Sequence, residues 1–189
     1  MAFQGKLVVI SAPSGAGKTS IAREVLHLNP SLAFSVSATT RSRRSGEEEG
    51  KDYFFLTSEE FLRRRDAGEF VEWETIYGNY YGTLKAEVDR AMKSGRHLLF
   101  DVDVKGGLSI KRQYPHALTV FIRPPSLEIL QQRLRDRKTE DVQTLARRLE
   151  RVPMELELGS AFEHQIVNDE LPRAIAAVQT IVQRYLQES

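Results

Sequence analysis

The sequence predicts an α/β fold in which a parallel sheet is flanked by helices. Short apolar runs at 6–10, 97–104, 117–122 and 164–167 alternate with stretches of helical periodicity, which is typical of parallel strands buried beneath helices. A glycine-rich segment follows the first run and opens a helical pattern. Residues 35–82 interrupt the alternation with aromatic, Thr- and Arg-rich strand patterns. We therefore expect one parallel core with a small β-rich insert.

Length and composition restrict the class of protein. The 189 residues can bury one good core, so we expect a single domain with subdomains. Cysteine is absent, which excludes disulfides and thiol catalysis. A net charge of +1 argues against a nucleic-acid partner, and no apolar window is long enough to span a membrane. The four histidines lack metal-ligand spacing. We therefore expect a soluble, cytoplasmic protein.

Residues 11–20, after the first apolar run, have the spacing of a phosphate-binding loop. Gly15 and Gly17 let successive backbone N–H groups turn toward phosphate oxygens, Lys18 can reach the β and γ phosphates, and the Thr19 hydroxyl can hold Mg²⁺. Alanine replaces the first glycine of the pattern. An ordinary glycine-rich turn is the alternative, but the loop opens an apolar helix, as a P-loop does. The predicted phosphate site comprises Ala12, Pro13, Ser14, Gly15, Ala16, Gly17, Lys18, Thr19 and Ser20.

Periodicity and end signals predict three helices before residue 100. The helix after the loop ends before Pro30. Its apolar face consists of Ile21, Val25 and Leu28. The capping box Thr57–Glu60 predicts a short helix that stops near Gly68. A third helix is expected over about 83–94, with Gly95 as its stop.

Three more helices are predicted in the C-terminal half. The segment Pro124-Pro125-Ser126 introduces a helix whose apolar face is Leu127, Leu130 and Leu134. A second stripe continues through Val142, Leu145, Leu149 and Val152, so the two helices could form a hairpin. At Pro153 we expect a kink or a helix end, because proline removes a backbone hydrogen bond. The last helix follows Pro172, with Ile175, Val178, Val182 and Tyr185 on one face.

The β-rich insert carries a second, more specific pattern. Its residues are Thr39-Thr40-Arg41, Arg44, Gly46-Glu47, Gly50 and Asp52-Tyr53, followed by 70–73 and 78–83. With the phosphate loop, this series resembles the guanylate kinase family, and the resemblance extends to 166–169. It implies a P-loop NTPase-type sheet with a small β-rich GMP-binding insert and a helical lid. The implied division is a core of 1–34, 83–125 and 153–189, a GMP-binding subdomain of 35–82 and a lid of 126–152.

The insert supplies residue types suited to a nucleoside monophosphate. Guanidinium groups and phenol hydroxyls are good donors to a dianionic phosphate, and the resemblance assigns Arg41, Arg44, Tyr53 and Tyr81 to the phosphate of GMP. A carboxylate opposite guanine N1–H and its 2-amino group, with hydroxyls opposite O6, would reject adenine. The family's base-reading positions fall on Glu72, Ser37 and Thr83. Taken singly, these residues are more typical of a solvated loop, an outward strand position and turn packing. Only their joint spacing favours a site.

Two further sets of residues complete the implied site. Asp101 and Asp103 follow a buried strand, where open α/β sheets bind ligands. The resemblance places Asp101 near the phosphates and the metal, either directly or through water, and Asp103 near the guanine amino group. Lys105 stands where the family usually has glutamine, and it could pair with Asp103 or approach a phosphate. The lid positions are Arg133, Arg137 and Arg148, and the adenine-contacting position is Asn168.

The resemblance implies an enzyme that transfers the γ-phosphate of ATP to GMP with Mg²⁺, giving ADP and GDP. Phosphoryl transfer requires mainly alignment and charge neutralisation, for which Lys18, Arg133, Arg137 and Arg148 are the candidate catalytic residues. One alternative is a catalytically silent module that binds phosphopeptides through the arginine and tyrosine cluster. The intact Lys18 and Thr19 argue against it. A kinase for another monophosphate is disfavoured by the base-reading residues.

Overall fold

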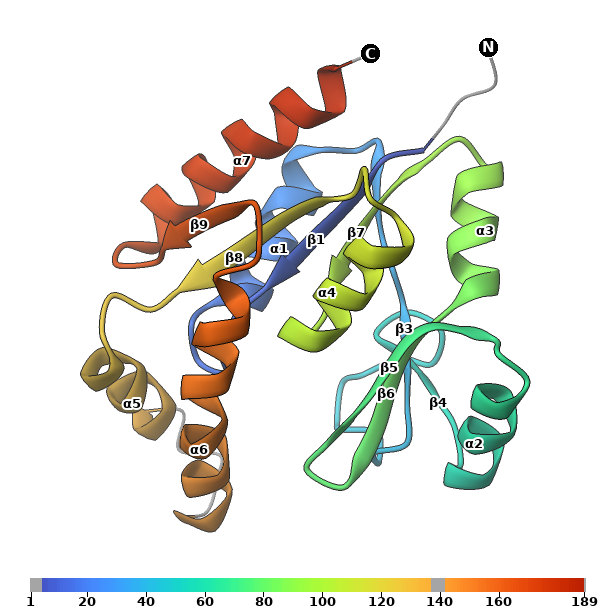
Figure 1. The fold of residues 1–189 in the computed structure, drawn as a ribbon, viewed down its shortest axis with the longest axis horizontal. Coiled ribbons are helices and arrows are strands. Elements are labelled where there is room, and N and C mark those ends of the chain that lie inside the picture. Colours follow the sequence, from blue (N-terminus) through green and yellow to red (C-terminus); the bar gives the residue numbers. More distant parts are fainter. Residues whose placement is uncertain (1–4, 137–141, 189) are drawn as a thin grey trace.

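The computed structural model of the protein describes residues 5–136 and 142–188, and it contains two sheets (Figure 1). The larger is a five-stranded parallel sheet of order β2-β7-β1-β8-β9. Its strands are β1 (Leu7–Ser11), β2 (Leu32–Phe34), β7 (His97–Asp101), β8 (Leu118–Arg123) and β9 (His164–Val167). The predicted α/β class with a parallel sheet flanked by helices is confirmed.

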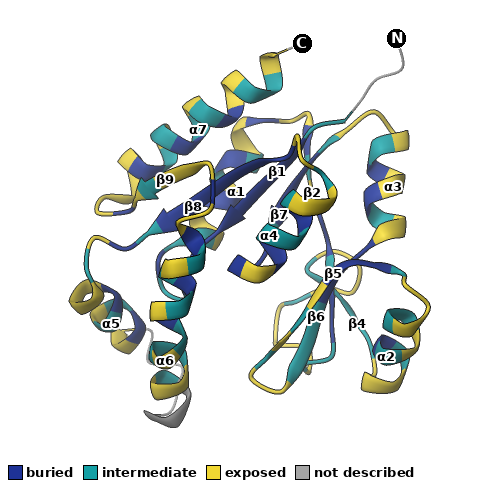
Figure 2. Cartoon of the chain, in the orientation of Figure 1, coloured by how far each residue is buried: buried dark blue, intermediate teal, exposed yellow. Residues whose placement is uncertain are grey.

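Helices cover both faces of this sheet, and the central strands β7, β1 and β8 are largely buried between them, whereas the edge strand β9 is mostly exposed (Figure 2). Val8 and Ile10 of β1 pack with α1 (Lys18–Leu28) and α7 (Leu171–Gln187) on one face. Leu7 and Val9 point to the other face, which α3 (Lys85–Lys93) and α4 (Val104–Gln113) cover. Alternate residues of the same strand thus enter two cores, which explains why the strand sequences are continuously apolar.

The second sheet is mixed, with order β4-β3-β6-β5, and lies beside the first (Figure 1). Its elements are β3 (Ser37–Thr39), β4 (Tyr53–Phe55), α2 (Ser58–Asp66), β5 (Phe70–Ile76) and β6 (Asn79–Leu84). A small core of its own, in which Phe61 stacks on Phe70 and Tyr80, holds α2 against the sheet. The helix begins as predicted, because the Thr57 hydroxyl accepts a hydrogen bond of 3.1 Å from the Glu60 amide.

The C-terminal helices α5 (Leu127–Asp136) and α6 (Val142–Gly159) extend beyond the edge of the large sheet (Figure 1). Of the kink or helix end predicted at Pro153, the helix end is wrong, since α6 continues for six residues after it. Leu127 was expected on the apolar face of α5 but is 46% exposed, whereas Leu130 and Leu134 are buried. Leu28 of α1 is likewise exposed.

Two other boundaries differ from the sequence prediction. Thr83 was placed at a helix start, but it pairs with Glu72 in the β5–β6 ladder, and α3 begins only at Lys85. The run 97–104 was expected to be one strand. It divides, because Asp103 caps α4 through a hydrogen bond of 2.8 Å from the Gly106 amide. The short strand β2 and the helix α4 are not among the predicted elements.

Strand register brings the candidate site residues to one edge of the large sheet. Ile10 pairs with Asp101, so the end of β7 lies beside the loop that follows β1. Carboxyl ends of parallel strands are the usual ligand-binding edge of such sheets. Within the described ranges, no helix combines the length and apolarity that crossing a membrane requires.

Candidate active site

The phosphate loop between β1 and α1 has an open anion-binding geometry. Gly15 and Gly17 adopt φ values of 88° and 96°, which only glycine takes without strain. Gly17 is the N-cap of α1, and no side chain from 5–136 or 142–188 caps the helix, so the first-turn N–H groups are available to an anion held by the loop. Ala12 is buried in the core and is not among the residues with positive φ. The alanine at the first consensus position therefore fits without distortion.

Lys18 and Asp101 form the ionic centre of the loop. The Lys18 Nζ lies 2.6 Å from Asp101 Oδ1 and donates a hydrogen bond of 2.9 Å to the Val102 carbonyl. Burial by itself would lower the pKa of Lys18, but the carboxylate of Asp101 outweighs it and the pKa is raised. Lys18 is therefore a fixed positive charge at neutral pH.

The same carboxylate provides a possible metal site. The Thr19 hydroxyl donates to Asp101 Oδ2 over 3.3 Å, so two hard oxygen donors lie together at the loop. Among the described residues no cluster of three or more His, Cys, Asp or Glu side chains could hold an ion alone. Mg²⁺ commonly takes one or two protein oxygens and completes its shell with phosphates and water. The pair fits that requirement once a polyphosphate is bound.

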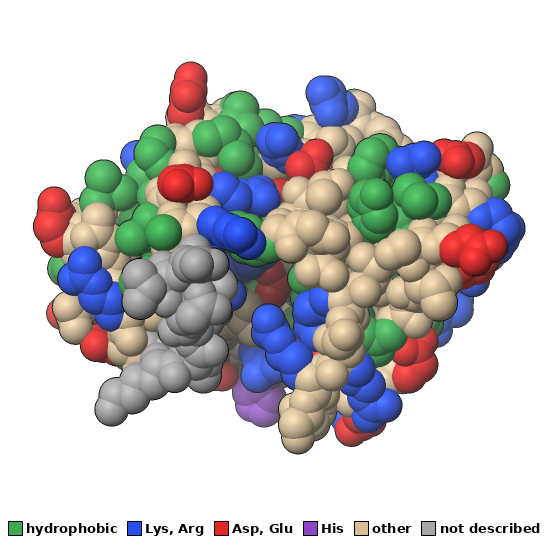
Figure 3. Space-filling view, turned by 90° about the horizontal axis from the view of Figure 1, so that it is seen from below, with side chains coloured by type: hydrophobic (Ala, Val, Ile, Leu, Met, Phe, Trp, Pro, Cys, Tyr) green, Lys and Arg blue, Asp and Glu red, His purple; other side chains and the backbone are tan. Residues whose placement is uncertain are grey.

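A hollow of about 200 Å³ lies between the phosphate loop and the second sheet. Basic side chains surround the hollowed middle of the face shown in Figure 3. Eight of the predicted residues line this hollow, four from the core and four from the second sheet. They are Lys18, Thr19, Asp101 and Asp103 from the core, and Ser37, Tyr53, Glu72 and Tyr81 from the second sheet. Residues far apart in the sequence thus share one cavity.

Glu72 is the most unusual ionisable group of the hollow. Its side chain is 7% exposed, and Oε1 accepts a hydrogen bond of 2.7 Å from the Thr83 hydroxyl. Burial raises the pKa of Glu72 to about 7, the nearby carboxylate of Asp103 adds to the effect, and the Thr83 hydrogen bond opposes it. A carboxylate that ionises near neutrality inside a cavity is characteristic of a ligand-recognition site.

Arg41 is held in place by a carboxylate to which the sequence analysis assigned no role. Its two terminal nitrogens donate to the oxygens of Glu47 over 2.7 and 2.5 Å. The guanidinium also lies over the Tyr53 ring, 4.9 Å from its centroid. This pairing lowers the pKa of Glu47 to about 2 and raises that of Arg41. The Arg44 side chain, by contrast, is exposed, and its backbone amide donates to Glu47 over 2.8 Å.

The three predicted lid arginines have different positions. Arg148 of α6 donates a hydrogen bond of 2.9 Å to the Ser14 hydroxyl, so it lies at the phosphate loop. Arg133 of α5 donates instead to the backbone carbonyl of Asp169 over 3.4 Å. Arg137 lies outside the described residues. Of the two lid arginines that the structure describes, only Arg148 contacts the loop in this conformation.

Asn168 supports the loop from behind. Its amide nitrogen donates to the Ala16 carbonyl over 2.7 Å, and a side chain at Gly17 would come within 2.3 Å of that nitrogen. The other amide atom, Oδ1, is buried with no hydrogen-bond partner in the part of the chain that is described. Asn168 therefore holds the loop through one amide atom, while its other amide atom is a buried acceptor left unsatisfied by the described residues.

Arg151 of α6 does not line the hollow but contacts a residue that does, and the sequence analysis did not predict this contact. Its guanidinium lies 3.2 Å from Oδ2 of Asp103, which is 48 positions away in the chain. Lys105, which could have paired with Asp103 or approached a phosphate, lies 3.4 Å from Glu74 Oε2 instead. Glu74 also lines the hollow and was not predicted. An isolated arginine in a helix with many charges carries no recognisable signal.

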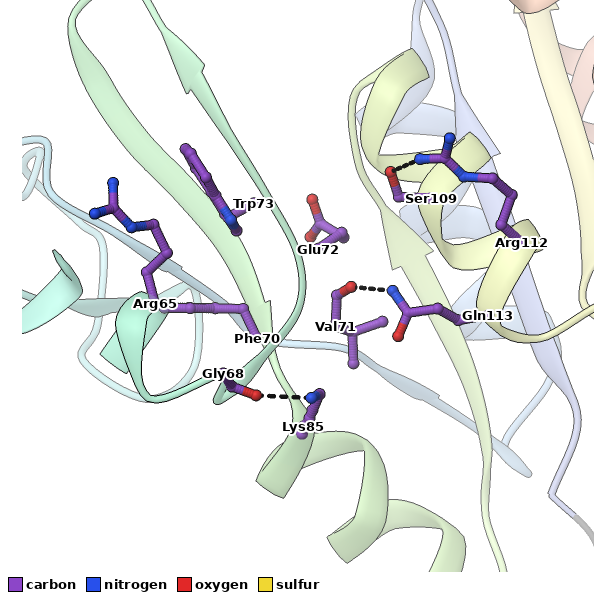
Figure 4. A pocket seen from close by; sticks show the side chains of 10 residues that line it. All are labelled: Arg65, Gly68, Phe70, Val71, Glu72, Trp73, Lys85, Ser109, Arg112 and Gln113. Carbon is purple, nitrogen blue, oxygen red and sulfur yellow. Dashed lines mark hydrogen bonds between the residues drawn. The ribbon is translucent and has the colours of Figure 1, made fainter. Parts of the chain in front are cut away.

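A larger hollow of about 370 Å³ lies on the other side of β5, between α2 and α4 (Figure 4). Glu72 lines both hollows, but no residue of the phosphate loop reaches this one. Lys85 donates to the Gly68 carbonyl and Gln113 to the Val71 carbonyl across its walls. The smaller hollow is lined both by residues that follow the phosphate loop, Lys18 and Thr19, and by residues of the second sheet. It is therefore the candidate active site.

Comparison with known proteins agrees with this geometry. The family model described as guanylate kinase matches residues 4–185. The guanylate kinase of Chlorobaculum tepidum is 47% identical over 98% of this chain and 95% of its own length. That of Symbiobacterium thermophilum is 44% identical over 95% of this chain and 85% of its own.

A solved structure shows the same arrangement. The crystal structure of guanylate kinase from Anaplasma phagocytophilum aligns with a TM-score of 0.79 and 29% sequence identity, covering 99% of this chain and 89% of that one. The family model and both relatives span nearly the whole chain, including the phosphate loop and the second sheet. The chain belongs to the guanylate kinase family.

Proposed function

We propose that the protein is an ATP:GMP phosphotransferase that produces ADP and GDP. The observation that carries the proposal is the shared hollow, in which Lys18 and Asp101 of the phosphate loop region face a buried carboxylate, Glu72, and two tyrosines of the second sheet. The guanylate kinase relatives support the choice of substrates.

The loop side would hold the donor. Backbone N–H groups at the start of α1 and the Lys18 ammonium would bind the phosphates of ATP, with Arg148 reaching the same loop. Mg²⁺, held by Thr19 and Asp101 together with phosphate oxygens, would neutralise charge on the transferring group. The Oδ1 of Asn168, which has no partner within the described ranges, would accept from the 6-amino group of adenine.

The second sheet would hold the acceptor. Arg41, Arg44, Tyr53 and Tyr81 are proposed to bind the phosphate of GMP. Glu72 would accept hydrogen bonds from guanine N1–H and the 2-amino group when ionised, with Asp103 near that amino group. Ser37, which lines the hollow, would donate toward O6, and Thr83 would do so only after giving up the hydrogen bond that it donates to Glu72. Adenine offers the opposite pattern and would leave buried polar groups unpaired.

Chemistry in this arrangement needs little beyond alignment. An oxygen of the GMP phosphate attacks the γ-phosphorus in line, a new P–O bond forms, and the bond from the γ-phosphorus to the β–γ bridging oxygen breaks to release ADP. Lys18 and Arg148 stabilise the charge that develops on the transferring group. We propose that Arg133 and Arg137 join them when 126–152 closes as a lid over the core, with 35–82 carrying the acceptor.

A coupled assay of ADP release with ATP and each of GMP, AMP, IMP and UMP tests the proposal. Turnover with GMP that greatly exceeds the others is the expected result. Turnover with another acceptor alone would replace the assigned substrate. An absence of turnover with every acceptor, together with binding of a phosphopeptide, would favour the catalytically silent module.

A further inference from the structure

Arg151 lies on α6 where three separate parts of the chain meet. Its terminal nitrogen is 3.2 Å from Asp103 Oδ2, its Nε is 3.5 Å from Glu155 Oε1, and its guanidinium carbon is 5.6 Å from the centroid of the Tyr77 ring. The side chains of Arg151, Asp103 and Glu155 are 19%, 12% and 9% exposed, so water screens these charges only weakly.

The contact with Asp103 determines how that carboxylate is presented to the hollow. Asp103 Oδ1 accepts from the Gly106 amide as the N-cap of α4, and Oδ2 meets Arg151. Asp103 also lies close enough to Glu72 to raise the pKa of its carboxyl group. The guanidinium of Arg151 therefore fixes the orientation of the Asp103 carboxylate and offsets the repulsion between Asp103 and Glu72.

The contacts with Glu155 and Tyr77 extend the network in opposite directions. Burial raises the pKa of the Glu155 carboxyl group, and the backbone amide of Ser14 in the phosphate loop lies near enough to oppose that rise. Tyr77 forms the turn between β5 and β6 and has a φ of 51°, the only positive φ of a non-glycine residue in the described chain. Such a conformation persists only where surrounding contacts hold it. Arg151 thus connects the hairpin of the second sheet to the phosphate loop through Glu155.

We propose that Arg151 is a positioning residue for the acceptor nucleotide, which orients Asp103 and connects the β5–β6 hairpin to the phosphate loop. The inference rests on the proposed GMP kinase activity. Loss of the arginine is expected to loosen the acceptor side of the hollow while the donor residues Lys18 and Thr19 keep their contacts. The effect therefore appears in the KM for GMP and in the coupling between the two nucleotides.

Steady-state kinetics with each substrate varied in turn test this role. Removing Arg151 alone would leave the buried Glu155 without its cation, so Arg151→Ala is made in a Glu155→Gln background and compared with Glu155→Gln alone. We expect the KM for GMP to rise roughly tenfold, as for loss of a charge-assisted hydrogen bond, and the KM for ATP to change less than about twofold. Arg147→Ala, which removes an exposed charge from the same helix, is the matched control.

If the proposal holds, Arg151→Lys raises the KM for GMP, but by less than Arg151→Ala does. Lysine keeps the charge but lacks the planar group that reaches three partners. Calorimetric titration of GMP with and without a non-hydrolysable ATP analogue measures the coupling directly, and Arg151→Lys is expected to reduce it several-fold. A merely structural arginine would lower the melting temperature and kcat without changing the KM for GMP or this coupling.

Tyr77 supplies a second test that spares the buried charges. Tyr77→Leu removes the aromatic face and is expected to raise the KM for GMP about threefold, whereas Tyr77→Phe keeps the ring and does not. Equal effects of Tyr77→Leu and Tyr77→Phe, or an Arg151 variant no different from Arg147→Ala, would overturn the inference. Because every comparison uses GMP turnover of the unmodified protein as its reference, an inactive wild type would instead refute the proposed function.

Discussion

The Thr83 hydroxyl donates a 2.7 Å hydrogen bond to Glu72, and both residues are buried, although only Glu72 lines the candidate active site. The two residues face each other across the β5–β6 ladder, so backbone register alone brings them together. The bond occupies Oε1 and leaves Oε2 close to Gly106. A carboxylate fixed in this way has little freedom to adapt to a different base.

Replacing Glu72 with glutamine is expected to reduce selectivity for guanine. The amide supplies a donor where N1–H needs an acceptor, so kcat/KM for GMP should fall about 100-fold or more relative to that for AMP. The KM for ATP should change little, because Lys18 and the loop are not altered. Glu59→Gln, an exposed carboxylate on α2, is the control. Equal losses for GMP and ATP would show that Glu72 does not read the base.

Binding of GMP should weaken as the pH falls below neutrality. Burial raises the pKa of Glu72 to about 7, so near pH 6 most of the ligand-free enzyme carries the protonated acid. Between pH 8 and pH 6 the KM for GMP should therefore rise roughly tenfold. The phosphate of GMP also titrates in this range. The pH profile of Glu72→Gln shows how much of the change comes from the GMP phosphate alone. Identical profiles for the variant and the wild type would contradict the assignment of the pH dependence to Glu72.

The same raised pKa makes Glu72 a source of instability at high pH. Between 4.5 and about 7 the folded protein keeps a proton that the unfolded chain has lost, so stability falls as pH rises through this window. Above it, Glu72→Gln should be more stable than the wild type by at most roughly 3 kcal/mol. Urea unfolding at pH 8 and pH 5 measures the difference, which should shrink at the lower pH.

Lys18→Ala should separate turnover from acceptor binding. The ammonium contacts Asp101 and Val102 on the donor side of the hollow, so its loss should lower kcat about 100- to 1,000-fold. Binding of GMP alone should change less than about threefold. Lys93→Ala, an exposed lysine on α3, controls for loss of charge. Unchanged turnover would refute the role given to the phosphate loop.

Much of this structure is readable from local pattern. The buried strand of β1, the phosphate loop and the Thr57 cap depend on neighbouring residues, and each appears where the sequence predicts it. Leu127 shows the limit of periodicity. Its spacing matches the apolar face of α5, but periodicity does not show how far the packed core extends along a helix. Leu127 is exposed, whereas Leu130 and Leu134 on the same face are buried.

Contacts between segments that are distant in the chain could not be predicted from local sequence patterns. The strand–helix boundary near Thr83 depends on pairing with Glu72 rather than on helix propensity, and Asp103 leaves its strand because the α4 amides need a cap. The partner of Lys105 is Glu74, 31 positions away, which no local rule selects. Arg151 was missed for the same reason. The residue types of a site are visible in the sequence, whereas their pairing is a property of the fold.

Glu47 offers the sharpest test of how the acceptor phosphate site is organised. Two hydrogen bonds from Arg41 fix the plane of the guanidinium, and the ring of Tyr53 lies against its face. Because the pKa of Glu47 is lowered to about 2, the pair stays ionised throughout the assay range. Two outcomes are then conceivable for Glu47→Ala. The freed arginine could bind phosphate more tightly, or it could lose the orientation that binding requires.

The geometry favours the second outcome. Glu47 also accepts from the Arg44 amide and so holds the whole 41–47 loop, which would become mobile without it. We expect Glu47→Ala to raise the KM for GMP five- to tenfold, equivalent to about 1 kcal/mol. Glu48→Ala removes a carboxylate that is 61% exposed and pairs only with Lys51 among the described residues, and it should have no effect. A lower KM for GMP in Glu47→Ala would mean that the carboxylate competes with the phosphate for Arg41 instead of orienting it.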